Sequence, residues 1–106
     1  MRKLVKIVVF VPSTHAEKIR EVLAHAGAGH VEKYDFCSFS VKGVGRFRPQ
    51  KGAKPFIGKA GEIEQVAEER IETICPKSKL KKVLAAVKDV HPYEEPAVDV
   101  YEVLSI

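Results

Sequence analysis

The side chains best suited to chemistry lie in one short segment, His91-Pro92-Tyr93-Glu94-Glu95-Pro96. It combines an imidazole, a phenol and two carboxylates with two prolines. Each proline fixes its own φ near about −65° and removes a backbone donor, and it pushes the preceding residue into an extended conformation. The segment is therefore predicted to be a stiff, extended connector that presents four polar groups.

Imidazole and carboxylate groups are metal ligands, and His91, Glu94 and Glu95 could supply two or three of them. Because a metal site generally needs at least three converging ligands, a divalent metal ion is expected here especially across a boundary between copies. The alternative is structural. In that interpretation a protonated His91 caps the preceding helix, where a cation is favoured, and the carboxylates bind nearby amides or arginines.

A second candidate set combines arginines, acids and a tyrosine and could bind a small ligand. Its members are Arg46, Arg48, Glu69, Arg70, Glu72 and Tyr93. The two arginines at 46 and 48 could pair with the acids at 69 and 72, because guanidinium groups bind carboxylates in a bidentate geometry. The set is either a cross-strand ladder or a polar pocket formed jointly by two copies.

Residues 43–61 contain five glycines and two prolines, so they are predicted to form a long loop. Free backbone amides with nearby Arg and Lys side chains could bind a phosphate or nucleotide. However, Gly-x-Gly-x-Phe is neither a Walker loop nor a dinucleotide fingerprint. With a net charge of only +4, nucleic acid is not expected as a partner.

The elements that must position these groups follow from hydrophobic periodicity. Strands are predicted at 3–11, 31–42, 62–74 and 97–104, and helices at 14–26 and 76–90. The first helix is expected to begin at the capping box Thr14–Glu17 and to stop at Gly27 or Gly29. The second begins with Pro76 as its first helical residue. Apolar positions in the third strand change from odd to even, which predicts a bulge.

The order β-α-β-β-α-β predicts one α+β domain over residues 1–106, with a ferredoxin-like, four-stranded antiparallel sheet and both helices on one face. The first strand is apolar on both sides, so the other face of the sheet is predicted to pack against a copy. Alternatively, the long loop covers that face with its own Phe47, Phe56 and Ile57.

Composition narrows the class of protein. With 45% hydrophobic and 30% charged residues, the chain is typical of a soluble globular domain. It lacks a run of roughly 18 apolar residues for a membrane span and a signal-peptide core, so we expect a cytoplasmic protein without a membrane partner. Cys37 and Cys75 fit neither a disulfide nor a zinc site, and no nucleophilic catalytic arrangement is recognisable.

The segment His91-Pro92-Tyr93-Glu94-x-Pro96, placed after the second helix of this plan, resembles the CutA-type trimers of the PII-like superfamily. A closer resemblance is to the inserted middle domain of the NIF-three-like, YqfO-type proteins. It rests on Ala26-Gly27-Ala28-Gly29, Tyr34, Cys37-Ser38-Phe39, Gly43-x-Gly45-x-Phe47-x-Pro49, Pro55-x-Ile57-Gly58, Glu69-Arg70-Ile71-Glu72 and His91 through Ala97.

The resemblance implies a stand-alone CutA/PII-like module that forms trimers through its sheet. The dinuclear metal site of the long family members lies in flanking domains, so none of its ligands transfers to this sequence. We expect a non-enzymatic, homotrimeric binding or regulatory module that holds a small ligand or a metal ion at subunit boundaries. The alternatives are a metal-dependent hydrolase related to the dinuclear-metal proteins and a nucleic-acid-binding module.

Overall fold

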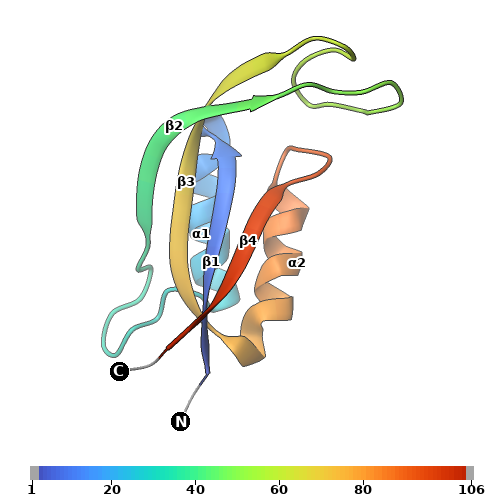
Figure 1. The fold of residues 1–106 in the computed structure, drawn as a ribbon. Coiled ribbons are helices and arrows are strands. Elements are labelled where there is room, and N and C mark those ends of the chain that lie inside the picture. The colour runs from blue at the N-terminus through green and yellow to red at the C-terminus, as the bar shows by residue number, and fades with distance from the viewer. Residues whose placement is uncertain (1–2, 105–106) are drawn as a thin grey trace.

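The computed structural model describes residues 3–104. Its strands are β1 (Leu4–Pro12), β2 (Phe39–Phe47), β3 (Glu64–Pro76) and β4 (Ala97–Val103), and its helices are α1 (Ala16–Ala26) and α2 (Leu80–Val90). The four strands form one antiparallel sheet in the order β2-β3-β1-β4. Both helices pack on the same face of this sheet (Figure 1). The predicted ferredoxin-like fold is therefore confirmed.

The core lies between the sheet and the helices. Alternate residues of β1 point into it, and the apolar faces of α1 and α2 cover them. The largest contributors are Val5, Ile7, Val9, Val11, Ile19, Leu23, Ile71, Val83 and Val87, all at most 2% exposed. Among the described residues, no helix has the length and apolar character needed to cross a membrane.

Both helices begin differently from the prediction. Each is preceded by a single 3-10 turn, Ser13–His15 before α1 and Lys77–Lys79 before α2. The capping box at Thr14 does not form, because the Thr14 hydroxyl contacts the neighbouring His15 ring, 2.8 Å away, and α1 has no side-chain cap. Pro76 ends β3 instead of starting the second helix. The predicted stop at Gly27 is confirmed, with a left-handed φ of 116°.

The second strand lies further along the chain than predicted. Residues 31–38 form a loop closed by one bridge between Val31 and Tyr34, and Glu32 and Phe36 adopt positive φ values that interrupt a strand. Residues 43–47, predicted as loop, belong to β2. The irregular connection between β2 and β3 is therefore shorter than predicted, at 48–63.

β3 pairs in one continuous register with both of its neighbours, so the predicted bulge is wrong. Its residues 69, 71, 73 and 75 are buried under the helices. The open face is also less apolar than expected, because Glu72 pairs there with Lys6 at 3.4 Å and with Arg70 at 3.0 Å. Exposed aromatic residues remain on this face at Phe39 and Tyr101.

Candidate functional site

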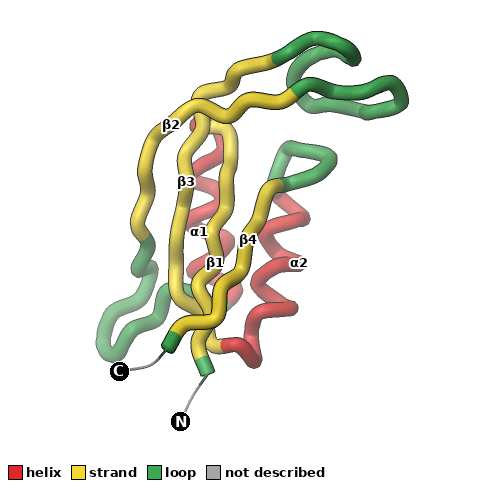
Figure 2. Tube along the Cα trace, in the orientation of Figure 1, coloured by secondary structure: helices red, strands yellow, loops and turns green. Residues whose placement is uncertain are grey.

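β2 and β3 continue past the end of the sheet as a two-stranded arm. β1 pairs with β3 only as far as Pro12 opposite Glu68, whereas β2 follows β3 to Phe47 opposite Glu64. This arm, residues 44–47 and 64–67 with the loop 48–63, arches toward the connector 91–96 (Figure 1). Both segments lie at the end of the molecule away from the chain termini (Figure 2).

A cavity of about 400 Å³ lies between the arm and the connector. Aromatic rings form much of its wall, from Phe10, Phe47, Phe56 and Tyr93. The Phe47 and Tyr93 rings meet edge to face with their centroids 5.6 Å apart. Charged side chains also line it, namely Arg46, Arg48, Glu68, Glu94 and Glu95. An apolar cavity of this size with a few polar groups is typical of small-ligand sites.

The polar centre of the cavity is a hydrogen bond between Tyr93 and Glu68. The Tyr93 hydroxyl donates to Glu68 Oε2 at 2.6 Å, and Glu68 is only 9% exposed. Burial and the neighbouring carboxylate both raise the pKa of Tyr93, so the phenol stays protonated as the donor. Gly45 makes this arrangement possible, because a Cβ there would lie 2.2 Å from the Glu68 carboxyl group.

His91 holds the connector against the sheet. Its Nε2 donates to the backbone oxygen of Phe10 at 2.8 Å, and its Nδ1 accepts from the Tyr93 amide at 3.2 Å. This pattern requires a neutral ring, and burial lowers the pKa of His91, with the Phe10 carbonyl acting in the opposite direction. The backbone of His91 caps α2 by donating to Val87. The predicted capping position is confirmed, but the protonated ring is not.

The loop 48–63 is held over the cavity at two points. The Lys54 amide donates to Glu94 Oε1 at 3.0 Å, which joins the loop to the connector. The Phe56 ring meets His15 edge to face, with the centroids 5.4 Å apart. The loop therefore covers the cavity, whose wall includes Phe10 and Glu68 at the far end of the open face.

The residues that were predicted together as ligand-binding lie at three different places in the structure. Arg46, Arg48 and Tyr93 line the cavity with the two connector carboxylates. Glu69 lies on the helix side of the sheet instead. Arg70 and Glu72 pair with each other on the open face. The expected pairing of Arg46 or Arg48 with these acids is wrong among the described residues, because the acids already have other cationic partners.

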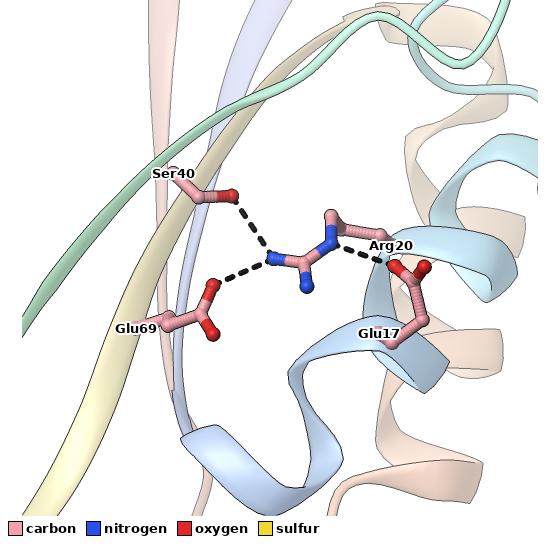
Figure 3. Close-up of polar contacts among 4 residues, drawn as sticks. All are labelled: Glu17, Arg20, Ser40 and Glu69. Carbon is pink, nitrogen blue, oxygen red and sulfur yellow. Dashed lines mark hydrogen bonds and ion pairs between the residues drawn. The ribbon is translucent and has the colours of Figure 1, made fainter.

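Glu69 belongs to a network that fastens α1 to the sheet (Figure 3). Arg20 Nη1 donates to Glu69 Oε1 at 2.6 Å and to the Ser40 hydroxyl at 3.1 Å. Arg20 Nε donates to Glu17 within the same helix at 2.8 Å. One guanidinium thus connects α1, β2 and β3, which is a structural role.

The predicted metal ligands do not converge within one copy of the chain. Both ring nitrogens of His91 are engaged with the backbone, and Glu94 accepts the Lys54 amide. Residues 3–104 contain no group of three or more His, Cys, Asp or Glu side chains that could hold a metal ion. A metal shared between copies through His91, Glu94 and Glu95 stays a prediction.

The sequence did not point to Phe10 or Glu68 as site residues. The strand pattern contains one usable signal. Glu68 and Glu69 are adjacent acids in a β-strand, so they must lie on opposite faces. Each of these acids therefore needs its own partner. Glu69 has Arg20, and Glu68, on the opposite face, needs a different one.

The fold is that of the CutA proteins. The described chain superimposes on CutA from Xylella fastidiosa with a TM-score of 0.72 and 20% identity, covering 97% of this chain and 86% of that one. CutA from Archaeoglobus fulgidus gives a TM-score of 0.68, also at 20% identity, covering 94% and 83%. At this identity the likeness concerns the fold alone.

Sequence similarity points to a narrower group. The chain is 53% identical over 98 residues to a protein of Halalkalibacterium halodurans named GTP cyclohydrolase 1 type 2 homolog, covering 92% of this chain. It is 51% identical over 100 residues to the Bacillus subtilis protein of the same name, covering 94% of this chain. A Bacillus cereus protein related to NIF3 superimposes with a TM-score of 0.83 at 49% identity, covering 96% of this chain and 26% of that one.

The chain spans about a quarter of the length of these relatives, 26% and 27% of the two named homologs. No family model matches it. The resemblance to a CutA-like domain of the NIF3-like proteins is confirmed over nearly the whole chain.

Proposed function

We propose that this chain is a non-enzymatic binding or regulatory module that assembles into a homotrimer and holds a small ligand at subunit boundaries. The observation that carries the proposal is the cavity at the base of the arm. Its wall combines aromatic rings with charged groups from two segments far apart in the chain. The CutA-like fold supports a small module of this kind.

The arm itself supports self-association. A two-stranded ribbon is at best marginally stable in water unless it packs against something else. Beyond Glu68 the arm has no third strand. The described chain is accordingly elongated, with a radius of gyration of 14.8 Å against about 13 Å for a compact domain of this length. Val44 on the arm is 69% exposed, which fits a surface that a second copy covers.

Light scattering coupled to size-exclusion chromatography tests the assembly. The expected mass is three times that of the 11.8 kDa chain. Val44→Glu on the arm should weaken assembly, because it buries a charge where a copy packs. Ala85→Glu, at an exposed position of α2, serves as the matched control and should leave the mass unchanged. A wild-type monomer at micromolar concentration would contradict the proposal.

Metal-dependent hydrolysis is a second candidate, and the observation favouring it is the name of the relatives, GTP cyclohydrolase 1 type 2 homolog. Metal analysis of untagged protein, with GTP turnover measured before and after chelation, tests this candidate. Bound transition metal and turnover lost on chelation would replace the binding module as the conclusion. Absence of both would remove hydrolysis from consideration.

A further inference from the structure

Glu68 is a buried acid without a cationic partner. It is 9% exposed, as is its neighbour Glu69. Glu69 is neutralised by Arg20 at 2.6 Å. Among the ion pairs of residues 3–104, none includes Glu68. Carboxylates this deeply buried are generally paired, because desolvation of an isolated charge is costly.

The guanidinium group of Arg70 is near Glu68 but does not pair with it. Arg70 follows Glu68 by two residues on the same face of β3, where it could pair with it. Instead its guanidinium binds Glu72 at 3.0 Å and lies 5.7 Å from the centre of the Phe10 ring. The only donor to Glu68 within the described chain is the neutral Tyr93 hydroxyl, which uses Oε2. Oε1 is therefore left for a donor from outside the chain.

The carboxylate occupies a shaped recess. The carboxyl group packs directly against Gly45, because a Cβ built there would lie 2.2 Å from Glu68 Oε1, so a larger residue at 45 would displace the carboxylate. The aromatic rings of Phe47 and Tyr93 stand beside this recess. The faces of aromatic rings attract cations, most strongly where water is excluded. The acid and the rings thus favour the same kind of ligand.

The other charged residues that line the cavity do not reverse its preference for a cation. Three carboxylates line the cavity, from Glu68, Glu94 and Glu95, against two guanidinium groups. Arg46 and Arg48 are both exposed, whereas Glu68 is buried. Charges in solvent are screened, but a charge in the cavity interior acts at close range. Glu68 is therefore the most enclosed of the charged groups in the cavity wall.

We propose that this cavity binds a small organic ammonium ion that carries an aromatic or similarly apolar group. Its N–H groups donate to Glu68 Oε1, and its apolar part lies among Phe10, Phe47 and Tyr93. This inference rests on the proposed function, because it names the ligand class for the same cavity. Tyr93 orients the carboxylate through Oε2, and Gly45 provides the space.

The test compares two probes of similar size and opposite charge, 2-phenylethylammonium and 3-phenylpropionate, by NMR titration of the assembled protein. The ammonium should bind and shift the resonances of Phe47 and Tyr93, whereas the carboxylate should not. Glu68→Gln keeps the shape of the side chain and should weaken ammonium binding about ten- to a hundredfold, as expected for a lost hydrogen bond to a charged group. Glu21→Gln, at an exposed position of α1, is the matched control and should bind like wild type.

Tyr93→Phe provides a second variant if Glu68→Gln does not fold. It removes the hydroxyl that fixes Oε2 and should reduce ammonium binding severalfold while keeping the preference for the cation. Preference for the carboxylate probe, equal binding by Glu68→Gln, or no binding of the ammonium would each overturn the inference. Light scattering on the same samples distinguishes the two failures, because loss of ammonium binding by an intact assembly overturns this inference alone, whereas absence of the assembly contradicts the proposed function.

Discussion

The molecule consists of two halves built on one plan, and they differ where each helix ends. β1 and β3 both finish at a proline, Pro12 and Pro76. Each is followed by one 3-10 turn and a helix of 11 residues. After α1 the chain reverses at Gly27 with a left-handed φ of 116°, whereas after α2 it leaves in an extended conformation at His91.

The difference shows where the cavity originates. The first half stops its helix with backbone alone, since Gly27 donates to the carbonyl of Ala24. The second half also ends its helix with a backbone bond, from the His91 amide to the Val87 carbonyl. Its His91 ring additionally binds the Phe10 carbonyl of β1 and the Tyr93 amide. That ring directs the connector across the end of the sheet and brings Tyr93 to Glu68. The same plan therefore yields a simple turn in one half and a cavity wall in the other.

His91→Ala should reduce the free energy of unfolding more than the other changes, because it removes the ring contacts that distinguish the second half. The substitution leaves the Phe10 carbonyl and the Tyr93 amide without their partner at a site that is 7% exposed. We expect a loss of about 2–4 kcal/mol in the free energy of unfolding, measured by urea denaturation. His30→Ala, at an exposed loop position, should change it by less than about 0.5 kcal/mol.

Arg20→Met should remove the contacts that fasten α1 to the sheet in the first half. It keeps the apolar stem but removes the charge that neutralises buried Glu69. We expect a loss of about 1–3 kcal/mol in the free energy of unfolding. Adding Glu69→Gln should recover part of this loss, because the unpaired charge disappears. A double variant whose loss equals the sum of the two single losses would show that the ion pair is unimportant.

Gly27→Ala tests the turn that ends the first helix. An alanine at a φ of 116° is strained, and we expect a loss of about 1–2 kcal/mol. Gly43→Ala is the matched control, because a Cβ there meets no atom within 4 Å and its φ is not positive. If both variants unfold at the same urea concentration, the left-handed turn is not what ends α1.

A pH titration gives the smallest expected effect and sharpens the role of His91. Burial holds its pKa below the ordinary value of 6.5 in the folded state. Protonation therefore favours unfolding, so stability is complete above that value and declines as the pH falls below it. The slope should not exceed about 1.4 kcal/mol per pH unit for one group.

Urea denaturation at several values between about pH 7 and pH 5 measures this slope. His91→Gln should flatten the dependence. An unchanged slope in His91→Gln would mean that another group is responsible.

The sequence predicted the element order and the helix faces because these depend on local periodicity. It misplaced β2 because Gly43 and Gly45 indicate a loop when read locally. Only the fold reveals that Gly45 lies opposite the Glu68 carboxylate. Similarly, a bulge was expected in β3 because acids and apolar residues alternate irregularly along it. The strand pairs without interruption because acids on both faces have partners, Glu69 on the helix side and Glu72 on the open face.

The candidate site was predicted in part. The connector was identified because its prolines and polar groups are contiguous in the sequence. Its partners Phe10 and Glu68 are 81 residues from His91 and 25 residues from Tyr93 respectively. Such contacts depend on the strand register and on the curvature of the arm, and neither is encoded by a local pattern.

The pairing of β1 with β4 has a practical consequence. Leu4 lies opposite Val103 in the register, so the first and last strands run side by side with their outer ends adjacent. A short peptide could therefore join them, and new ends could be opened in the exposed residues 50–54. Such a circular permutant would keep every strand pairing while releasing one side of the loop that covers the cavity.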